Sequence, residues 1–143
     1  MLAALVFLAV YLIRKKIASK VEEKQKDPAY IVALRNLDKY RGDKFWTPEK
    51  QKTFYSGITD TLREYISDRF GIDACEMTTA EIFSALKGNP EIPEDLFSQT
   101  KDLFEMADFV KFAKHTVGDD ENAKAIPSAV QFVMSTHEEN VEE

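Results

Sequence analysis

A chain of 143 residues is long enough to bury one hydrophobic core and too short for two. Its content of 44% hydrophobic and 31% charged residues is ordinary for a globular protein and excludes a chain that is disordered throughout. The single cysteine excludes an internal disulfide and favours a reducing compartment. With only five glycines, sharp turns are few and the composition favours helices.

The net charge of −6 conceals a strong asymmetry along the chain. Up to Thr53 there are twelve Lys or Arg against six Asp or Glu, a balance of +6. From Phe54 onward there are seven against nineteen, a balance of −12. Because an acidic region repels phosphate backbones, this part of the chain is not expected to bind nucleic acid.

The chain starts with thirteen apolar residues, MLAALVFLAVYLI, followed directly by Arg14, Lys15 and Lys16. A helix of this length measures about 20 Å, whereas the hydrocarbon core of a bilayer measures about 30 Å, so the run is too short to span it unaided. The positive charges follow the apolar run instead of preceding it, which argues against a cleaved signal peptide.

We interpret residues 1–13 as the truncated end of a transmembrane helix. The basic residues that follow favour the cytoplasmic side of a membrane, so the residues after Ile13 are predicted to be cytoplasmic. Two alternatives remain open: a terminal helix packed in a soluble core, and an anchor that lies on the membrane surface.

Residues 14–46 are predicted to form a basic juxtamembrane stalk and a short helix. The stretch to Lys26 has strong helix formers without an apolar face, which is typical of a stalk that lifts a domain off a membrane. A basic residue near anionic lipid contributes up to about 1 kcal/mol, so the stalk is also a candidate lipid sensor. Its candidate lipid-facing residues are Arg14, Lys15, Lys16 and Lys20.

Two start signals that contain proline predict the next two helices. Asp27 and Pro28 predict a helix to about Tyr40, because proline fits a first helical turn and aspartate can cap it. Thr47 and Pro48 predict a longer helix that ends at Gly71. Its apolar residues step by three and four and predict one buried stripe: Phe54, Ile58, Leu62, Tyr65, Ile66 and Phe70.

Three further helices complete the predicted domain. Thr78 and Glu81 form a capping-box pattern before a short helix, and Pro93 opens a helix that continues through Ala107. A last helix is expected to start at Asp119 or Asp120, and a proline inside it, Pro127, should kink or split it. The predicted core residues of this helix are Ala123, Ile126, Val130, Val133 and Met134.

These elements predict an all-α fold, a small bundle of five or six short helices that follows an N-terminal membrane-anchor and stalk helix. No segment shows the alternating pattern of a strand. Residues 47–138 are assigned to a helical cytoplasmic domain and residues 139–143 to an acidic tail.

The stretch ADFVKFAKH, residues 107–115, has two interpretations. On a helix its two phenylalanines share a sector with Val110 and Ala113, while Lys111 and Lys114 fall on the other side. The first interpretation places Phe109 and Phe112 in the core. The second makes a partner-binding patch of Asp108, Lys111 and Lys114.

A row of carboxylates lies along the predicted helix 47–71. Asp60, Glu64 and Asp68 are four residues apart, so they share a face opposite much of the apolar stripe. On an exposed face these groups are solvated charges and do no acid–base catalysis. Such a face suits a basic groove on a protein partner, so the three residues are candidate partner-binding residues.

No catalytic, cofactor-binding or metal-binding residues are predicted. His115 and His137 have no second ligand at a metal-binding spacing, and Cys75 has no histidine near it in sequence and reads as a small buried residue. The chain has no P-loop, GxGxxG or GxSxG motif, so any ATP hydrolysis is expected from a partner. The rival interpretation is a hydrolase or small-ligand domain that uses Cys75, His115 or the acidic helix.

Three short stretches in order carry a resemblance: LREYISDRFG at 62–71, MTTAEI at 77–82 and ADFVKFAK at 107–114. Together they resemble the cytoplasmic C-terminal domain of Bat D-like bacterial membrane proteins from aerotolerance operons. The likeness covers roughly residues 52–136. It implies a location at the bacterial inner membrane and association with a MoxR-type AAA+ ATPase and with von Willebrand A domain proteins. No catalytic residues come with this family. The function expected is a non-catalytic, membrane-tethered interaction module.

Overall fold

The computed structural model describes residues 2–25, 27–41, 47–113 and 116–137, with the backbone alone described for residues 16–25. In these ranges the chain is helical and has no strand, which confirms the all-α prediction. A short 3-10 turn, Ala74–Glu76, follows the third helix. The six α-helices are α1 Leu2–Gln25, α2 Ala29–Asp38, α3 Pro48–Phe70, α4 Thr79–Leu86, α5 Glu94–Phe112 and α6 Asp119–Thr136.

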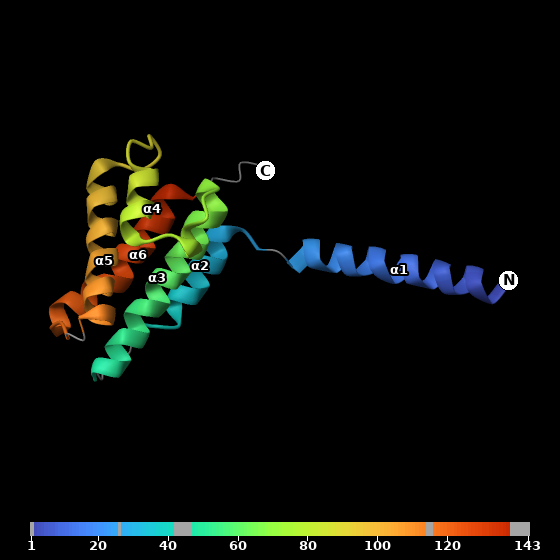
Figure 1. Ribbon diagram of the computed structural model, residues 1–143, viewed down its shortest axis with the longest axis horizontal. Helices are drawn as coiled ribbons and strands as arrows, with labels where there is room; N and C mark the ends of the chain where they lie inside the picture. Colours follow the sequence, from blue (N-terminus) through green and yellow to red (C-terminus); the bar gives the residue numbers. More distant parts are fainter. Residues whose placement is uncertain (1, 26, 42–46, 114–115, 138–143) are drawn as a thin grey trace.

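Helices α2 to α6 form a bundle with α3 at its centre, while α1 projects away from it (Figure 1). α3 packs against α2, α5 and α6, α2 also packs against α6, and α4 lies on α5. The core is therefore built around α3.

α3 begins and ends where the sequence predicts. The side chain of Thr47 caps the first turn by accepting a hydrogen bond from the amide of Lys50 at 3.2 Å. Gly71 ends the helix in the left-handed conformation, with φ at 72°, which glycine adopts without strain. Five of the six residues of the predicted apolar stripe are buried and Phe70 is partly buried.

A seam of polar contacts joins α3 to α6, and it was not predicted. Gln51 is hydrogen-bonded to the backbone of Val117 at one end. At the other end the guanidinium nitrogen Nε of Arg69 donates to the carbonyl of Thr136 at 2.7 Å. Between them, Tyr65 shares a hydrogen bond of 2.8 Å with the hydroxyl of Thr136. The residue numbers rise together on both helices, so α3 and α6 run parallel.

A glycine in the middle of α3 allows α2 to approach closely. A Cβ at Gly57 would clash with the ring of Tyr40, which comes from the end of α2 and packs edge-on against Phe54 at 6.3 Å. Glycine inside a helix costs about 0.5–1 kcal/mol relative to alanine. At this position the absence of a side chain leaves room for Tyr40, so the aromatic contact between Tyr40 and Phe54 can form.

The start of α2 departs from its prediction. The carboxylate of Asp27 makes no cap hydrogen bond and instead accepts a hydrogen bond from Arg35 at 2.8 Å. The first amides are satisfied by the backbone, since those of Ile31 and Val32 donate to the carbonyl of Pro28. In α2 the proline alone therefore marks the start of the helix, without a side-chain cap from the aspartate.

α4 and α5 pack through aromatic rings. The predicted capping box at the start of α4 is present, with Thr78 and Glu81 each accepting from the other's backbone amide. The ring of Phe83 lies edge-on to Phe104 at 5.1 Å and to Phe97 at 5.5 Å. Edge-to-face pairs of this kind add about 0.5–1.5 kcal/mol each to the burial of the rings.

α6 runs unbroken through Pro127, so of the two outcomes predicted for this proline, a kink or a split, the split does not occur. Pro127 is exposed. The buried face also differs from the predicted one, because Phe132 is fully buried whereas Ala123 and Met134 are exposed. The seam with α3, which buries Asn122 and Thr136, sets the rotation of α6.

α1 has a different environment from the other helices. Its side chains from Leu2 to Lys15 are all exposed, and it makes no extensive contact with the bundle (Figure 1). None of the helices in the described ranges is sufficiently long and apolar to cross a membrane. The predicted transmembrane anchor is therefore not supported by the structure, and the alternative in which α1 packs into the bundle core is wrong.

Candidate functional site

A groove with a volume of about 510 Å³ lies between α5 and α6. Leu103 and Met106 from α5, and Ala125 and Pro127 from α6, supply apolar surface to it, and Tyr55 reaches it from α3. A second hollow, of about 640 Å³, shares Met106 and continues the groove towards the end of α5. We call these two hollows together the α5–α6 groove.

Hydrogen bonds define both ends of the α5–α6 groove. At one end Nε2 of Gln99 donates to Ser128 and to Gln131, each at 3.0 Å, and joins the two helices. At the other end the buried side chain of Gln51 donates to the carbonyl of Val117 at 3.0 Å and accepts from its amide at 2.9 Å. Gln99 thus links the two walls of the groove directly, whereas Gln51 links α3 to the segment before α6.

Buried polar groups lie beside the groove. The hydroxyl of Tyr55 donates to Oδ1 of Asn122 at 2.9 Å. Burial, and then the negative charge of Glu121, raise the pKa of Tyr55 to about 12, so its hydroxyl stays protonated and remains a donor. Nδ2 of Asn122 is buried and has no partner among the described residues.

The charged residues that line the groove are mostly acidic. Asp102, Glu105 and Glu121 are exposed carboxylates, and Lys124 is the one basic residue that lines either hollow. Lys124 already has a partner, because its Nζ lies 3.6 Å from the carboxylate of Glu121. In the described part of the chain, Asp102 and Glu105 therefore have no ion-pair partner among the residues that line the groove.

Pro127 removes one hydrogen bond from the backbone of α6. Proline has no N–H, so the carbonyl of Ala123 loses the hydrogen-bond donor that a helix normally supplies four residues later. Both Ala123 and Pro127 line the groove.

The structure corrects the core interpretation of ADFVKFAKH. Val110 is buried, but the side chain of Phe109 is 46% exposed and that of Phe112 is 76% exposed. The buried face of α5 is set by residues that step from Leu96 through Thr100, Leu103, Phe104 and Ala107 to Val110. Phe109 and Phe112 fall off this stripe, so they are not core anchors.

Two of the three residues of the alternative patch in this stretch, Asp108 and Lys111, lie in the described part of the chain. Asp108 is partly buried and accepts a hydrogen bond of 2.7 Å from the hydroxyl of Thr79, which joins α5 to the start of α4. Nζ of Lys111 lies 5.5 Å from the centre of the Phe112 ring. Lys114 lies outside the described residues. Asp108 thus has a structural partner within the chain.

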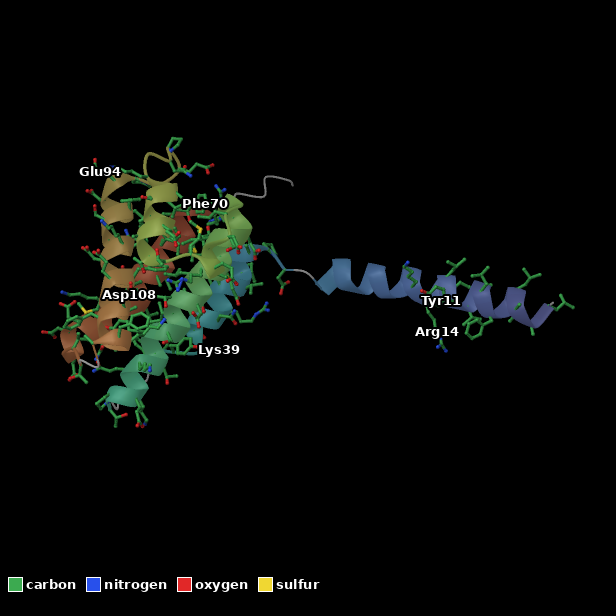
Figure 2. The ribbon with its side chains drawn as sticks, in the orientation of Figure 1. Tyr11, Arg14, Lys39, Phe70, Glu94 and Asp108 are labelled. Carbon is green, nitrogen blue, oxygen red and sulfur yellow. The ribbon has the colours of Figure 1, made fainter. Side chains whose placement is uncertain are left out.

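The other predicted residues stand apart from the groove. Asp60, Glu64 and Asp68 are exposed along α3, and they line neither hollow. Figure 2 shows Arg14 on α1, far from the bundle that carries Asp108. Arg14 and Lys15 are exposed, and the side chains of the other two basic candidates, Lys16 and Lys20, lie outside the described residues.

Of the residues named by the rival hydrolytic interpretation, those in the described part of the chain line neither hollow of the groove. Cys75 is exposed, which corrects the expectation that it is buried, and its Sγ lies 3.9 Å from the hydroxyl of Ser67. The ring of His137 stacks on Tyr30 at 4.4 Å, and His115 lies outside the described residues. In the described ranges no three His, Cys, Asp or Glu residues are grouped so as to hold a metal ion.

No family model, curated protein or solved structure matches this chain. The resemblance to Bat D-like domains therefore remains a prediction. The fold and the groove define this protein as an all-α helical bundle with an open, acidic groove on one side and an apolar helix that stands apart.

Sequence reasoning missed the groove because its residues are dispersed. They come from α3, α5 and α6, and each is unremarkable in its own segment. One signal was present, since Pro127 interrupts the hydrogen bonding of a predicted helix and lines the groove.

Proposed function

We propose that this chain is a non-catalytic, membrane-tethered interaction module, with α1 in the apolar phase of a membrane and the bundle in the water beside it. The exposure of α1 carries the proposal. A helix that is apolar on every side is normally surrounded by a protein core or by lipid. From Leu2 to Ile13 α1 has no polar face, and the bundle does not cover it.

The charges that follow the apolar turns give the proposal its orientation. Arg14 and Lys15 would lie at the lipid headgroups, with the bundle on the cytoplasmic side of a bacterial inner membrane. The resemblance supplies the expected complex, which contains a MoxR-type AAA+ ATPase and von Willebrand A domain proteins. The acidic bundle would be repelled by anionic lipid and so remain accessible to such partners.

Liposome flotation of the full chain tests the tether. The combined variant Leu5→Asp and Leu8→Asp is expected to leave the lipid fraction, because each aspartate costs about 2.5–3.5 kcal/mol inside a membrane helix. The matched control carries Val32→Asp and Met134→Asp, which change exposed apolar residues of the bundle, and should float as the unmodified chain does. The proposal is wrong if the unmodified chain stays at the bottom of the gradient.

A second measurement separates insertion from electrostatic attachment to the lipid surface. Replacing Arg14, Lys15, Lys16 and Lys20 by glutamine should weaken binding to anionic vesicles, and salt should weaken the binding of the unmodified chain. Binding that is indifferent to both changes would exclude a lipid-sensing role for the stalk and leave the apolar turns as the anchor.

A further inference from the structure

We propose that the α5–α6 groove binds a short, basic, amphipathic helix of a partner protein. The inference deepens the proposed function, since it names the partner chemistry for the interaction module and the surface that receives it.

The charge of the groove selects a cationic partner. Asp102, Glu105 and Glu121 line the groove, and Lys124 compensates for one of them at most. An acidic surface attracts basic segments and repels acidic ones, and this complementarity acts mainly on the rate and specificity of binding. The residues from Phe54 onward, with their balance of −12, extend the same negative field around the groove.

The acceptors of the groove match the chemistry of a basic segment. Its exposed carboxylates accept hydrogen bonds, and Pro127, which lines the groove, cannot donate one to the backbone of Ala123. Lysine and arginine side chains carry several donors and no acceptor, so they suit a surface of this kind.

The dimensions of the groove suit a helix of a few turns. The groove extends along α5 from Gln99 to Phe109, which is about 15 Å at 1.5 Å per residue, or roughly ten residues of a bound helix. Leu103 and Met106 provide apolar surface, and methionine adapts its shape to different partner side chains. Helix-in-groove recognition uses such apolar anchors, with charges at the rim.

The exposed carboxylates of α3 are the competing surface. Asp60, Glu64 and Asp68 present three negative charges, as the groove does, but they border no described hollow that would take apolar anchors. Neutralising either set changes the net charge of the chain by the same amount. A difference in peptide binding between the two variants therefore identifies the surface that binds.

The test measures fluorescence anisotropy of a labelled peptide, Lys-Leu-Ala-Lys-Leu-Leu-Ala-Lys-Leu, with the full chain in dodecyl maltoside micelles and empty micelles as the blank. The groove variant combines Asp102→Asn, Glu105→Gln and Glu121→Gln. The control variant combines Asp60→Asn, Glu64→Gln and Asp68→Asn. We expect the groove variant to raise Kd at least tenfold and the control variant to change Kd less than twofold.

Two further variants examine the apolar surface and the competing lysine. Met106→Asp should raise Kd although it adds negative charge, because it destroys apolar surface in the groove. Lys124→Gln should lower Kd, since it releases Glu121 for the peptide.

The proposal is overturned by equal effects of the two combined variants, by no binding of the peptide, or by equal binding of a peptide with glutamate in place of lysine. Self-association of the chain that the groove variant abolishes would also overturn it, because a second copy would then occupy the groove. None of these results depends on lipid, so they are separate from the failure of the tether, which flotation measures.

Discussion

α1 and α3 are helices of almost equal length, 24 and 23 residues, in opposite environments. In α1 the described side chains up to Lys15 are exposed in every direction. In α3 nine residues are buried, and the exposed carboxylates Asp60, Glu64 and Asp68 lie between them. The difference shows that a helix packs into the bundle through one apolar side while its other side remains in solvent. The first turns of α1 have no polar side, and the bundle leaves them uncovered.

The strongest test of this difference replaces a phenylalanine by alanine, once in the buried core and once on exposed α1. Phe104 is 1% exposed and Phe7 is 77% exposed. Phe104→Ala should lower the free energy of unfolding by about 3–5 kcal/mol, because it removes a ring that packs against Phe83 and leaves a cavity. Phe7→Ala should change it by less than about 0.5 kcal/mol. Urea denaturation followed by circular dichroism measures both.

Phe112→Ala serves as a control within α5 itself. Its ring is exposed, so the loss should be under about 1 kcal/mol. A loss comparable to that of Phe104→Ala would contradict the exposed position of this ring at the end of α5.

Breaking the polar seam between α3 and α6 should have the next largest effect on the free energy of unfolding. Gln51→Leu removes two hydrogen bonds to the backbone of Val117 and should cost about 1–3 kcal/mol. Exchange of the Val117 amide with solvent should also become faster. Lys52→Leu, one residue further at an exposed position, is the matched control and should change neither quantity. Equal effects of the two variants would show that Gln51 makes no specific contribution to the seam.

The cap of α4 is expected to have a smaller effect. Thr78→Ala removes the hydroxyl that accepts from the amide of Glu81 at 3.2 Å, and should cost about 1 kcal/mol. Thr78→Ser keeps the acceptor and should retain most of the stability. The thermal unfolding midpoints of the two variants compare them directly, and identical midpoints would mean that the cap contributes nothing measurable.

The smallest effect concerns alkaline pH. Burial, with the charge of Glu121, raises the pKa of Tyr55 from 10.0 to about 12, so the folded state favours the neutral phenol. This contribution to stability is complete below pH 10 and is lost as the pH rises through about 12. Stability should therefore fall more steeply over this range in the unmodified chain than in Tyr55→Phe, as measured by urea midpoints. Parallel curves would contradict the shift.

Local signals in the sequence predicted most of the helices. Thr47, Gly71 and Thr78 act within a few residues of themselves, through a cap or a left-handed turn, so their consequences can be read without the fold. The apolar stripe of α3 was equally direct, since a period of three and four residues on a long helix leaves one face to bury.

Other features of the fold depended on contacts between distant residues. Phe112 is apolar at a plausible helical position, yet it is exposed because α5 turns its other side to the bundle. Met134, predicted in the core, is exposed and Phe132 is buried, because Tyr65 and Arg69 bond the end of α6 and fix its rotation. No pattern within α6 alone contains that information.

The sequence by itself determined which segments are helical, that the bundle is acidic, and that the first turns are apolar on every side. These properties depend on neighbours along the chain and on composition. Only the tertiary structure decided which residues meet across helices, and so where the α5–α6 groove lies and which carboxylates line it. The physical reason is that a groove is made of side chains from separate helices, and their rotation is set by packing and by buried hydrogen bonds between residues more than 60 positions apart.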